Sequence, residues 1–149
     1  MRQSQVVCCR VCASRVFASV VGVAVSSQLN PPIRVAHVTE AGAGGVRVHL
    51  GHIMPELTAR GIAVDLLVSA GRSEPDLAVF LDRLHRFGCR TSVVPMAHGL
   101  RPFQDLVARR RLGVQVSEWG VDLVHAHATK AGLLVRCCPE IVRNVPIIY

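Results

Sequence analysis

The sequence lacks several features that would assign it to a well-marked class. It contains no G-x-x-x-x-G-K-[ST] segment, which excludes a P-loop nucleotide site. Its apolar run from Val16 to Val25 is far shorter than the ~20 residues that a membrane-spanning helix needs. We find no internal repeat and no low-complexity tract. Half of the 149 residues are hydrophobic, so the chain is expected to fold around a core.

Cysteine is present, but its spacing defines no zinc or disulfide framework. Only Cys9 and Cys12 have C-x-x-C spacing, and no second pair follows at zinc-finger distance. Cys137 and Cys138 fall in an apolar helical pattern, where cysteine acts as a small buried hydrophobe. We therefore expect no metal site, and unpaired cysteines of this kind suit a reducing cytosol.

The charge balance is basic, with 17 Lys and Arg against 10 Asp and Glu and a formal net charge of +7. Such a balance fits anionic partners, namely phosphates, acidic lipid headgroups or nucleic acid. An ordinary soluble domain with a basic surface is an equal alternative. Arg101 and the run Arg109–Arg111 could rest on anionic lipid or could form a solvated helix face.

Residues 1–32 differ in composition from the rest of the chain. Three arginines precede the apolar run and small polar residues follow it, as in a secretory signal peptide. A weak membrane-surface anchor and an unstructured extension are the alternatives. We favour the extension, dispensable for folding, because a cytosolic type of fold follows. Pro31 and Pro32 mark the boundary, so we expect one domain over residues 33–149.

Beyond this boundary, strand and helix patterns alternate. Strands are predicted at 33–39, 62–69, 91–96, 121–127 and 145–149, and helices at 46–60, 77–87 and 102–119, the second one opened by a capping box at 73–76. A last helix starts at Thr129 and Lys130, with its apolar stripe at 133–141. Pro55 and Pro139 should kink or interrupt their helices, and Gly113 weakens the third. This alternation predicts an α/β fold with a Rossmann-like, doubly wound parallel sheet.

A glycine-rich turn, Gly42-Ala-Gly-Gly-Val46, joins the first predicted strand to the first helix. In such sheets, ligands bind beyond the carboxyl ends of the strands. Glycine lets the backbone approach a ligand, and a helix N-terminus directs free N–H groups at an anion, so a diphosphate is the natural guest. The alternative is a tight turn that needs glycine for steric reasons.

The same turn matches a dinucleotide fingerprint poorly. Arg47 occupies the position of the third glycine of G-x-G-x-x-G. Asp65 lies at about the distance expected for the ribose-binding acid, but the predicted strand continues past it. An NAD-type Rossmann domain of an oxidoreductase therefore stays as an alternative.

Two histidines, His125 and His127, end the fourth predicted strand. Residues two apart face the same side of a sheet, and His127 is the last residue before the loop at the ligand edge. A histidine there can hydrogen-bond a hydroxyl or phosphate, or exchange a proton near neutral pH. A metal would need a third ligand, and no nearby Asp, Glu or Cys supplies one at familiar spacing. A packed histidine without function is the alternative; Lys130, at the start of the next helix, could meet a phosphate.

Several segments, taken in order, resemble family 4 glycosyltransferases. The opening of that family is similar to Gly44-Gly-Val46 followed by Leu57–Gly61 and Val64–Val68. The segment Val-Asp-Leu-Val-His-Ala-His-Ala-Thr-Lys-Ala-Gly at 121–132 resembles the family's D-hydrophobic-V-H-A-H-x-x-K-A-G segment, and the last strand at 145–149 is also similar.

The resemblance implies the B-type glycosyltransferase architecture, with two Rossmann-like domains and the active site between them. The first domain mostly holds the acceptor and the second holds the nucleotide sugar. The chain would then be an incomplete first domain, cut short at its C-terminal end. Gly44, Gly45 and Lys130 would line the cleft near the donor diphosphate, and His127 would be catalytic, contacting the transferred sugar.

The function implied by the resemblance is retaining sugar transfer from a nucleotide-sugar donor to a polysaccharide or lipid-linked acceptor. The nucleotide sugar is a substrate, so no cofactor and no metal are expected, and the absence of an Asp-x-Asp motif agrees with this. We expect a cytoplasmic location, with peripheral contact at the inner membrane face, and no nucleic-acid partner. This chain alone is expected to be inactive, and an inert gene fragment is a further alternative.

Overall fold

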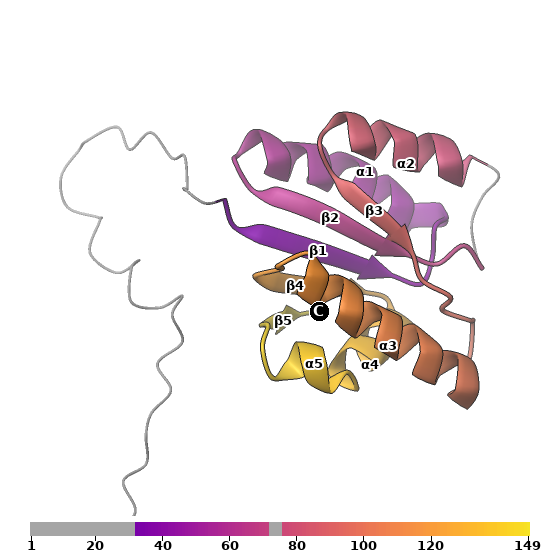
Figure 1. The fold of residues 1–149 in the computed structure, drawn as a ribbon. Coiled ribbons are helices and arrows are strands. Elements are labelled where there is room, and N and C mark those ends of the chain that lie inside the picture. Colours follow the sequence, from indigo (N-terminus) through magenta and orange to yellow (C-terminus); the bar gives the residue numbers. More distant parts are fainter. Residues whose placement is uncertain (1–31, 72–75) are drawn as a thin grey trace, which may run out of the picture.

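The structure is a computed structural model that describes residues 32–71 and 76–149. Five parallel strands alternate with helices, as the sequence pattern predicts (Figure 1). The elements are β1 Arg34–Thr39, α1 Gly44–Ala59, β2 Ala63–Val68, α2 Leu77–Arg86, β3 Arg90–Val93, α3 Pro102–Glu118, β4 Leu123–His127, α4 Thr129–Arg136, α5 Pro139–Val142 and β5 Ile147–Ile148.

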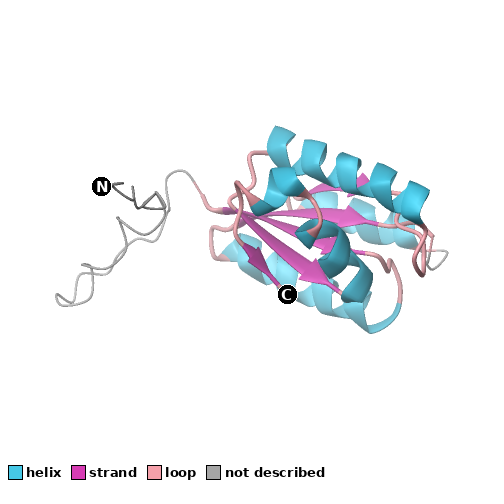
Figure 2. Cartoon of the chain, turned by 90° about the horizontal axis from the view of Figure 1, so that it is seen from below, coloured by secondary structure: helices cyan, strands magenta, loops and turns pink. Residues whose placement is uncertain are grey.

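The strand order is β3-β2-β1-β4-β5, and every neighbouring pair is parallel (Figure 2). The chain runs outward from β1 to β3 and then returns to the other side of β1 with β4. The order therefore reverses between β1 and β4, which is the point where open parallel sheets form a ligand crevice. The site residues predicted from the sequence follow these two strands.

Helices cover both faces of the sheet, so each strand is buried from both sides. Helices α1 and α2 lie on one face, and α3, α4 and α5 lie on the other (Figure 1). Alternate residues of β1 illustrate the division, because Val35 packs in the first layer whereas Ala36 and Val38 pack in the second. Burial on both faces explains why the inner strands are nearly continuous apolar runs.

The prolines act differently at the three positions where they could end an element. Helix α1 continues through Pro55, since Leu50 and Met54 are buried in the core and hold the helix against the sheet. Pro139 separates α4 from α5, as predicted, and begins the short α5. The third strand ends at Val93 rather than Met96, because Pro95 has no N–H to continue the ladder.

Gly113 does not interrupt α3, which runs from Pro102 to Glu118. A Cβ atom at this position would lie 3.0 Å from the Cys138 sulfur and 3.3 Å from the Glu140 side chain. Glycine therefore lets α3 pack closely on α5. The helix keeps its length because Ala108, Leu112 and neighbouring apolar residues anchor it to the core.

Two interpretations of the sequence fall wholly or mainly outside the described residues. These are the extension before the domain and the capping box of α2. Of the capping box only Asp76 is described, and its side chain makes no capping hydrogen bond but pairs with Arg47. In the part of the chain that the structure describes, no helix combines the length and apolar character needed to cross a bilayer.

Candidate functional site

Three histidines meet toward the carboxyl ends of β1 and β4. His37 of β1 is directly paired with His125 of β4, and His127 follows two residues later on the same face of the sheet. His37 Nδ1 lies 3.0 Å from His127 Nε2, so one of the two nitrogens carries the hydrogen that the other accepts. The structure thus brings together His127, which the sequence predicts as a site residue, and His37, which it does not.

All three imidazoles are held in the neutral form. Burial, followed by the nearby His127 and His125, lowers the pKa of His37 from 6.5 to about 3. Burial, followed by His125 and His49, lowers the pKa of His127 to about 4. Burial also lowers the pKa of His125. At neutral pH, His127 can therefore donate or accept a hydrogen bond but brings no positive charge to a phosphate.

The glycine turn opens onto the same edge of the sheet. Gly44, with φ of 64°, and Gly45 begin α1, and a Cβ atom at either position would meet no other atom within 4 Å. The residue before the helix, Ala43, offers no capping side chain. His49, farther along α1, has its ring 5.9 Å from that of His127. A glycine-rich helix start at the same sheet edge as a strand-end histidine can hold an anion next to a hydrogen-bonding imidazole.

The Lys130 side chain contacts Asp105 and the Gly99 carbonyl. Only 6% of its surface is exposed, and its ammonium group donates to Asp105 Oδ2 at 2.5 Å and to the Gly99 carbonyl at 2.6 Å. These contacts join the start of α4 to the start of α3. Contact with a donor phosphate would require Lys130 to leave Asp105, and that role stays a prediction.

The residue after His127 has an unusual backbone conformation. Ala128 has φ of 69° and ψ of 154°, a region that residues with a side chain rarely adopt. Such strain costs on the order of 1–3 kcal/mol and gathers at functional sites, where the surroundings enforce it. Alanine gives no sign of this in the sequence, so sequence reasoning could not have found it.

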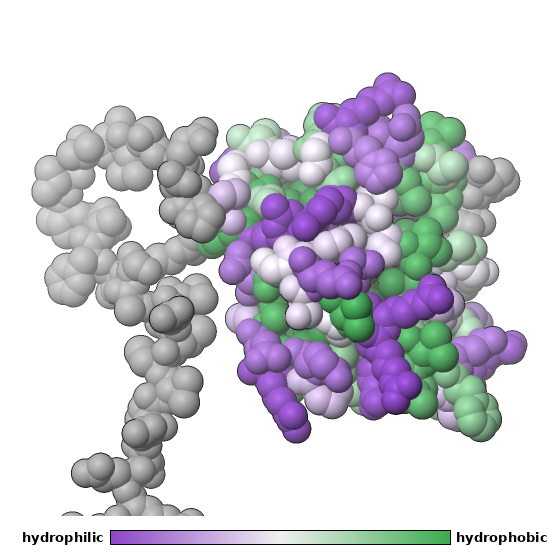
Figure 3. All heavy atoms as spheres, viewed as in Figure 1, coloured by the Kyte–Doolittle hydropathy of each residue, from purple (hydrophilic) through white to green (hydrophobic). Residues whose placement is uncertain are grey.

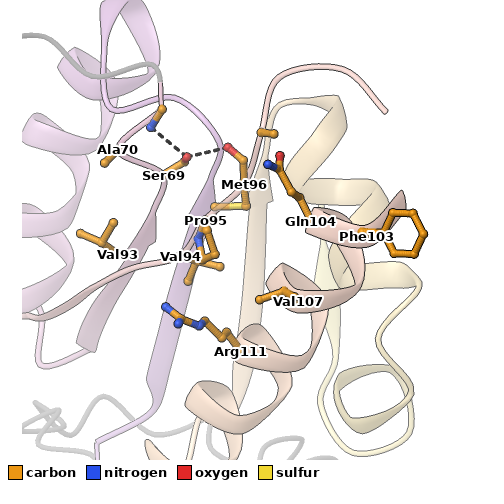
Figure 4. Close-up of a pocket in the computed structure, with 12 residues that line it drawn as sticks. Ser69, Ala70, Val93, Val94, Pro95, Met96, Phe103, Gln104, Val107 and Arg111 are labelled. Atoms are coloured by element: carbon orange, nitrogen blue, oxygen red, sulfur yellow. Dashed lines mark hydrogen bonds between the residues drawn. The ribbon is translucent and has the colours of Figure 1, made fainter. Parts of the chain in front are cut away.

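An apolar pocket of 680 Å³ lies farther along the same edge, between the ends of β2 and β3 and the first turns of α3 (Figure 4). Val94, Pro95, Met96 and Val107 supply much of its wall, and Arg111 lies at one end. Ser69 secures the wall by donating to the Met96 carbonyl at 2.7 Å. Sequence reasoning missed this pocket, because a helix predicted at 102–119 does not by itself indicate a concave surface.

The residues considered for a dinucleotide site have other partners. Arg47 of α1 pairs with Asp76 at 2.5 Å. The Asp65 carboxylate is fully buried and pairs with Arg34 at 3.0 Å and with Arg90 at 2.7 Å. An acid held in this way is not available to a ribose, so the oxidoreductase alternative is not favoured.

The Rossmann-like parallel sheet, the glycine turn before α1 and the histidine that ends β4 are the features expected of the first domain of a B-type glycosyltransferase. Residues 44–149 match the family of glycosyl transferase 4-like domains, and the chain belongs to that family. No curated protein matches the sequence significantly.

Solved structures of other proteins share this fold at low sequence identity. MurG of Acinetobacter baumannii is 18% identical with a TM-score of 0.55, and the match covers 78% of this chain and 34% of MurG. A glycosyltransferase of Rickettsia africae is 13% identical with a TM-score of 0.57, covering 78% and 28% respectively. The C-terminal domain of the PF1911 hydrogenase of Pyrococcus furiosus is 18% identical with a TM-score of 0.51, covering 78% and 89%. The chain therefore spans about a third of the length of the two glycosyltransferase-fold neighbours.

Proposed function

We propose that this chain is the acceptor-side domain of a retaining glycosyltransferase that takes a sugar from a nucleotide-sugar donor. The observation that carries the proposal is that the glycine turn before α1 follows β1 while His127 ends β4, the two strands at which the order reverses, with His49 of α1 5.9 Å from His127 between ring centres. The family membership supports this assignment. The donor, the acceptor and the stereochemical outcome belong to the proposal.

In this proposal the helix start receives the diphosphate of the donor. A Cβ atom at Gly44 or Gly45 would meet nothing within 4 Å, so a ligand can approach the backbone closely there, and the helix dipole favours negative charge at this end. Both effects favour departure of a diphosphate as negative charge develops on it. The transfer needs no metal ion or cofactor, because the nucleotide sugar itself is a substrate.

His127 contributes as a neutral group that fixes the transferred sugar. Its contact with His37 holds the ring in one orientation, and its depressed pKa keeps the ring uncharged. A neutral imidazole can donate a hydrogen bond to a sugar hydroxyl without attracting a second anion into the site. The role assigned to His127 is therefore positioning of the sugar rather than charge neutralisation.

The apolar pocket favours a lipid-linked acceptor over a free polysaccharide. The pocket wall is mostly aliphatic, and the adjoining loop and helix expose Leu100 and Phe103 to 78% and 88%. Figure 3 shows hydrophobic side chains gathered at the end of the molecule where the strands end. Arg101 and Arg110 are exposed beside them, a combination that suits peripheral contact with an anionic membrane surface.

The donor part of this proposal is tested by titrating the isotope-labelled chain with inorganic pyrophosphate and with UDP, observed by NMR. We expect amide shifts at residues 44–47 together with shifts of the His127 ring. Gly45→Asp should weaken binding roughly twofold to fivefold, matching ~0.3–1 kcal/mol for a charge at a helix start. An acidic residue in a first turn also favours the helix, so this variant should fold.

Ser117→Asp is the charge-matched control, because Ser117 is exposed near the C-terminal end of a different helix, α3. It should leave the titration unchanged. Shifts confined to Arg109–Arg111, or equal weakening by both substitutions, would mean that the chain binds anions only through its general positive charge.

A further inference from the structure

A groove of 290 Å³ runs between α1 and α2, on the face of the sheet that α3 does not cover (Figure 1). Gly51 of α1 and Phe80 of α2 meet across it, and a Cβ atom on Gly51 would lie 3.4 Å from the Phe80 ring. Phe80 is only partly buried. The two helices therefore pack closely and leave an aromatic ring accessible in the groove between them.

The two walls of the groove change from apolar to basic in the same direction. Because β1, β2 and β3 are parallel, α1 and α2 both run back along the sheet the same way. Val48 of α1 and Val79 of α2 line the groove and are 57% and 70% exposed. His52 and Arg83 follow four residues later, on the same faces of the two helices. The groove thus has an apolar end and a basic end about 5.4 Å apart, which is one helical turn.

Arg83 differs from its neighbouring arginines in having no acidic partner. The other arginines of these two helices and of the turn after α1 are paired, as Arg47–Asp76, Arg60–Glu56 and Arg86–Asp82. Within residues 32–71 and 76–149, neither Arg83 nor His52 forms a hydrogen bond or an ion pair. Asp76 is the one acid among the described lining residues, and Arg47 already holds it. The basic end of the groove can therefore receive a carboxylate from outside the chain.

We propose that the groove between α1 and α2 is a docking site for an acidic amphipathic helix of a partner protein. An apolar side chain of that helix packs on Phe80 between Val48 and Val79, and a carboxylate four residues further along meets Arg83. This is the helix-in-groove mode of recognition, in which side chains one turn apart face the same side. The inference goes beyond the proposed transferase function and does not depend on it.

Charge and shape together select this occupant. A second copy of the chain carries the same formal net charge of +7, so its approach to the basic end is opposed by like charges. A flat lipid surface would leave the Phe80 ring in the groove uncovered, whereas a side chain projecting from a helix can reach it. A helix with acidic and apolar residues one turn apart complements both ends of the groove at once.

The test uses a synthetic, hydrocarbon-stapled helical peptide built from Ala and Gln, with one Leu and a Glu four residues after it. The peptide is titrated into the isotope-labelled chain and observed by NMR. We expect saturable shifts at Val48, Gly51, Phe80 and Arg83. Replacing the peptide's Leu by Ala should weaken binding about tenfold, because an apolar contact is lost. Replacing its Glu by Gln should weaken binding about twofold to fivefold, as for an exposed ion pair.

Variants of the chain separate direct pairing from general attraction. Arg83→Glu should weaken binding of the Glu peptide about twofold to fivefold or more. Arg86→Glu is the matched control, because Arg86 is exposed on the same helix but does not line the groove, and it should leave binding unchanged. A peptide with Lys in place of Glu should bind Arg83→Glu more tightly than it binds the parent. The remaining net charge of the chain opposes a cationic peptide, so this recovery would report a contact at residue 83 itself.

Four results would overturn the proposal. The first is the absence of shifts in the groove at millimolar peptide. The second is equal weakening by Arg83→Glu and Arg86→Glu, and the third is a Lys peptide that shows no preference for Arg83→Glu. The fourth is self-association of the chain, measured by analytical ultracentrifugation and abolished by Val79→Asp, which would assign the groove to a second copy.

Discussion

Ala128 is the one non-glycine residue with positive φ in the described part of the chain, and its strain can be measured. Ala128→Gly should raise the free energy of unfolding by about 1 kcal/mol. Relief of ~1–3 kcal/mol of backbone strain exceeds the ~0.5–1 kcal/mol that glycine costs through the unfolded state. Denaturant unfolding measures the change.

Ala78→Gly provides the comparison, because Ala78 is exposed within α2. It should lower stability by ~0.5–1 kcal/mol, the usual cost of glycine in a helix. If both glycine variants lose stability alike, Ala128 is not strained in solution.

Asp65 makes the stability of the protein sensitive to acid. Burial raises its pKa, but hydrogen bonds from Arg90 and Arg34 lower it more, and the net shift is below the usual 3.8. A depressed folded-state pKa adds stability above the unfolded-state pKa, and that stability is lost as the pH falls through the folded-state value. The protein should therefore lose stability as the pH is lowered below about 4.

Asp65→Asn removes this carboxylate and leaves two arginines without their acid. The variant should lose about 3 kcal/mol or more at pH 7, since breaking a buried ion pair is costly. Its unfolding free energy should also vary less between pH 5 and pH 3 (roughly the range around the ordinary carboxyl pKa) than that of the parent. Urea unfolding across this range decides the matter, and parallel pH profiles would contradict the assignment.

Of the described helices and strands, α3 exposes the largest number of large apolar side chains. Phe103, Leu106 and Val107 are exposed on its first turns, and Arg101 and Arg110 are exposed beside them. Arg101→Glu with Arg110→Glu should reduce sedimentation with phosphatidylserine vesicles, because each basic residue near an anionic surface contributes about 1 kcal/mol. Vesicle sedimentation measures the bound fraction.

The matched control for α3 is the same charge change on α2, Arg83→Glu with Arg86→Glu, at two exposed positions. It should reduce binding much less. Equal binding of the parent chain to neutral and to anionic vesicles would contradict an electrostatic attraction of Arg101 and Arg110 to the lipid.

Most elements could be predicted from the sequence because their signals are local. Apolar spacing within single segments indicated all five strands and the main helices. The sequence pattern placed the end of β3 too late, because that end depends on the backbone ladder of the sheet. It also predicted a kink at Pro55, whereas core packing keeps α1 continuous there.

The candidate site was only partly predictable for a related reason. The turn at Gly44 and the strand end at His127 follow from local patterns, but their proximity depends on strand order. His37 is 90 residues from His127 in sequence and reaches it only because β4 returns to pair with β1. For Lys130, the local pattern suggested contact with a phosphate, but the folded chain places its ammonium group against Asp105.

At the scale of the whole molecule, the purified 149-residue chain should transfer no sugar. Positioning of two substrates can contribute ~7–11 kcal/mol to lowering a barrier, whereas an exposed helix start offers ~0.3–1 kcal/mol per charge. In the proposed function this domain supplies one wall of such a site, and the match spans 34% and 28% of the two glycosyltransferase-fold neighbours. Incubation with radiolabelled nucleotide sugars and lipid extracts tests the expectation.

His127→Ala serves as the reference in that assay, because contaminating activity would be the same in both samples. Turnover that is present in the parent chain and lost in His127→Ala would contradict the expectation of inactivity while supporting the assignment of His127.

The buried pair of Lys130 and Asp105 joins the segment after His127 to the first turn of α3. Lys130 follows the His127 loop by three residues, and Asp105 is in the first turn of α3 beside the apolar pocket. A ligand that draws Lys130 away removes its hydrogen bonds to the Gly99 carbonyl and to the Asp105 carboxylate, which then keeps only the backbone N–H of Arg101. Linkage is reciprocal, so if such a ligand changes affinity at the pocket, occupation of the pocket changes affinity beside Lys130 by the same factor. Negative or positive cooperativity between the two ligands would then be a property of one lysine.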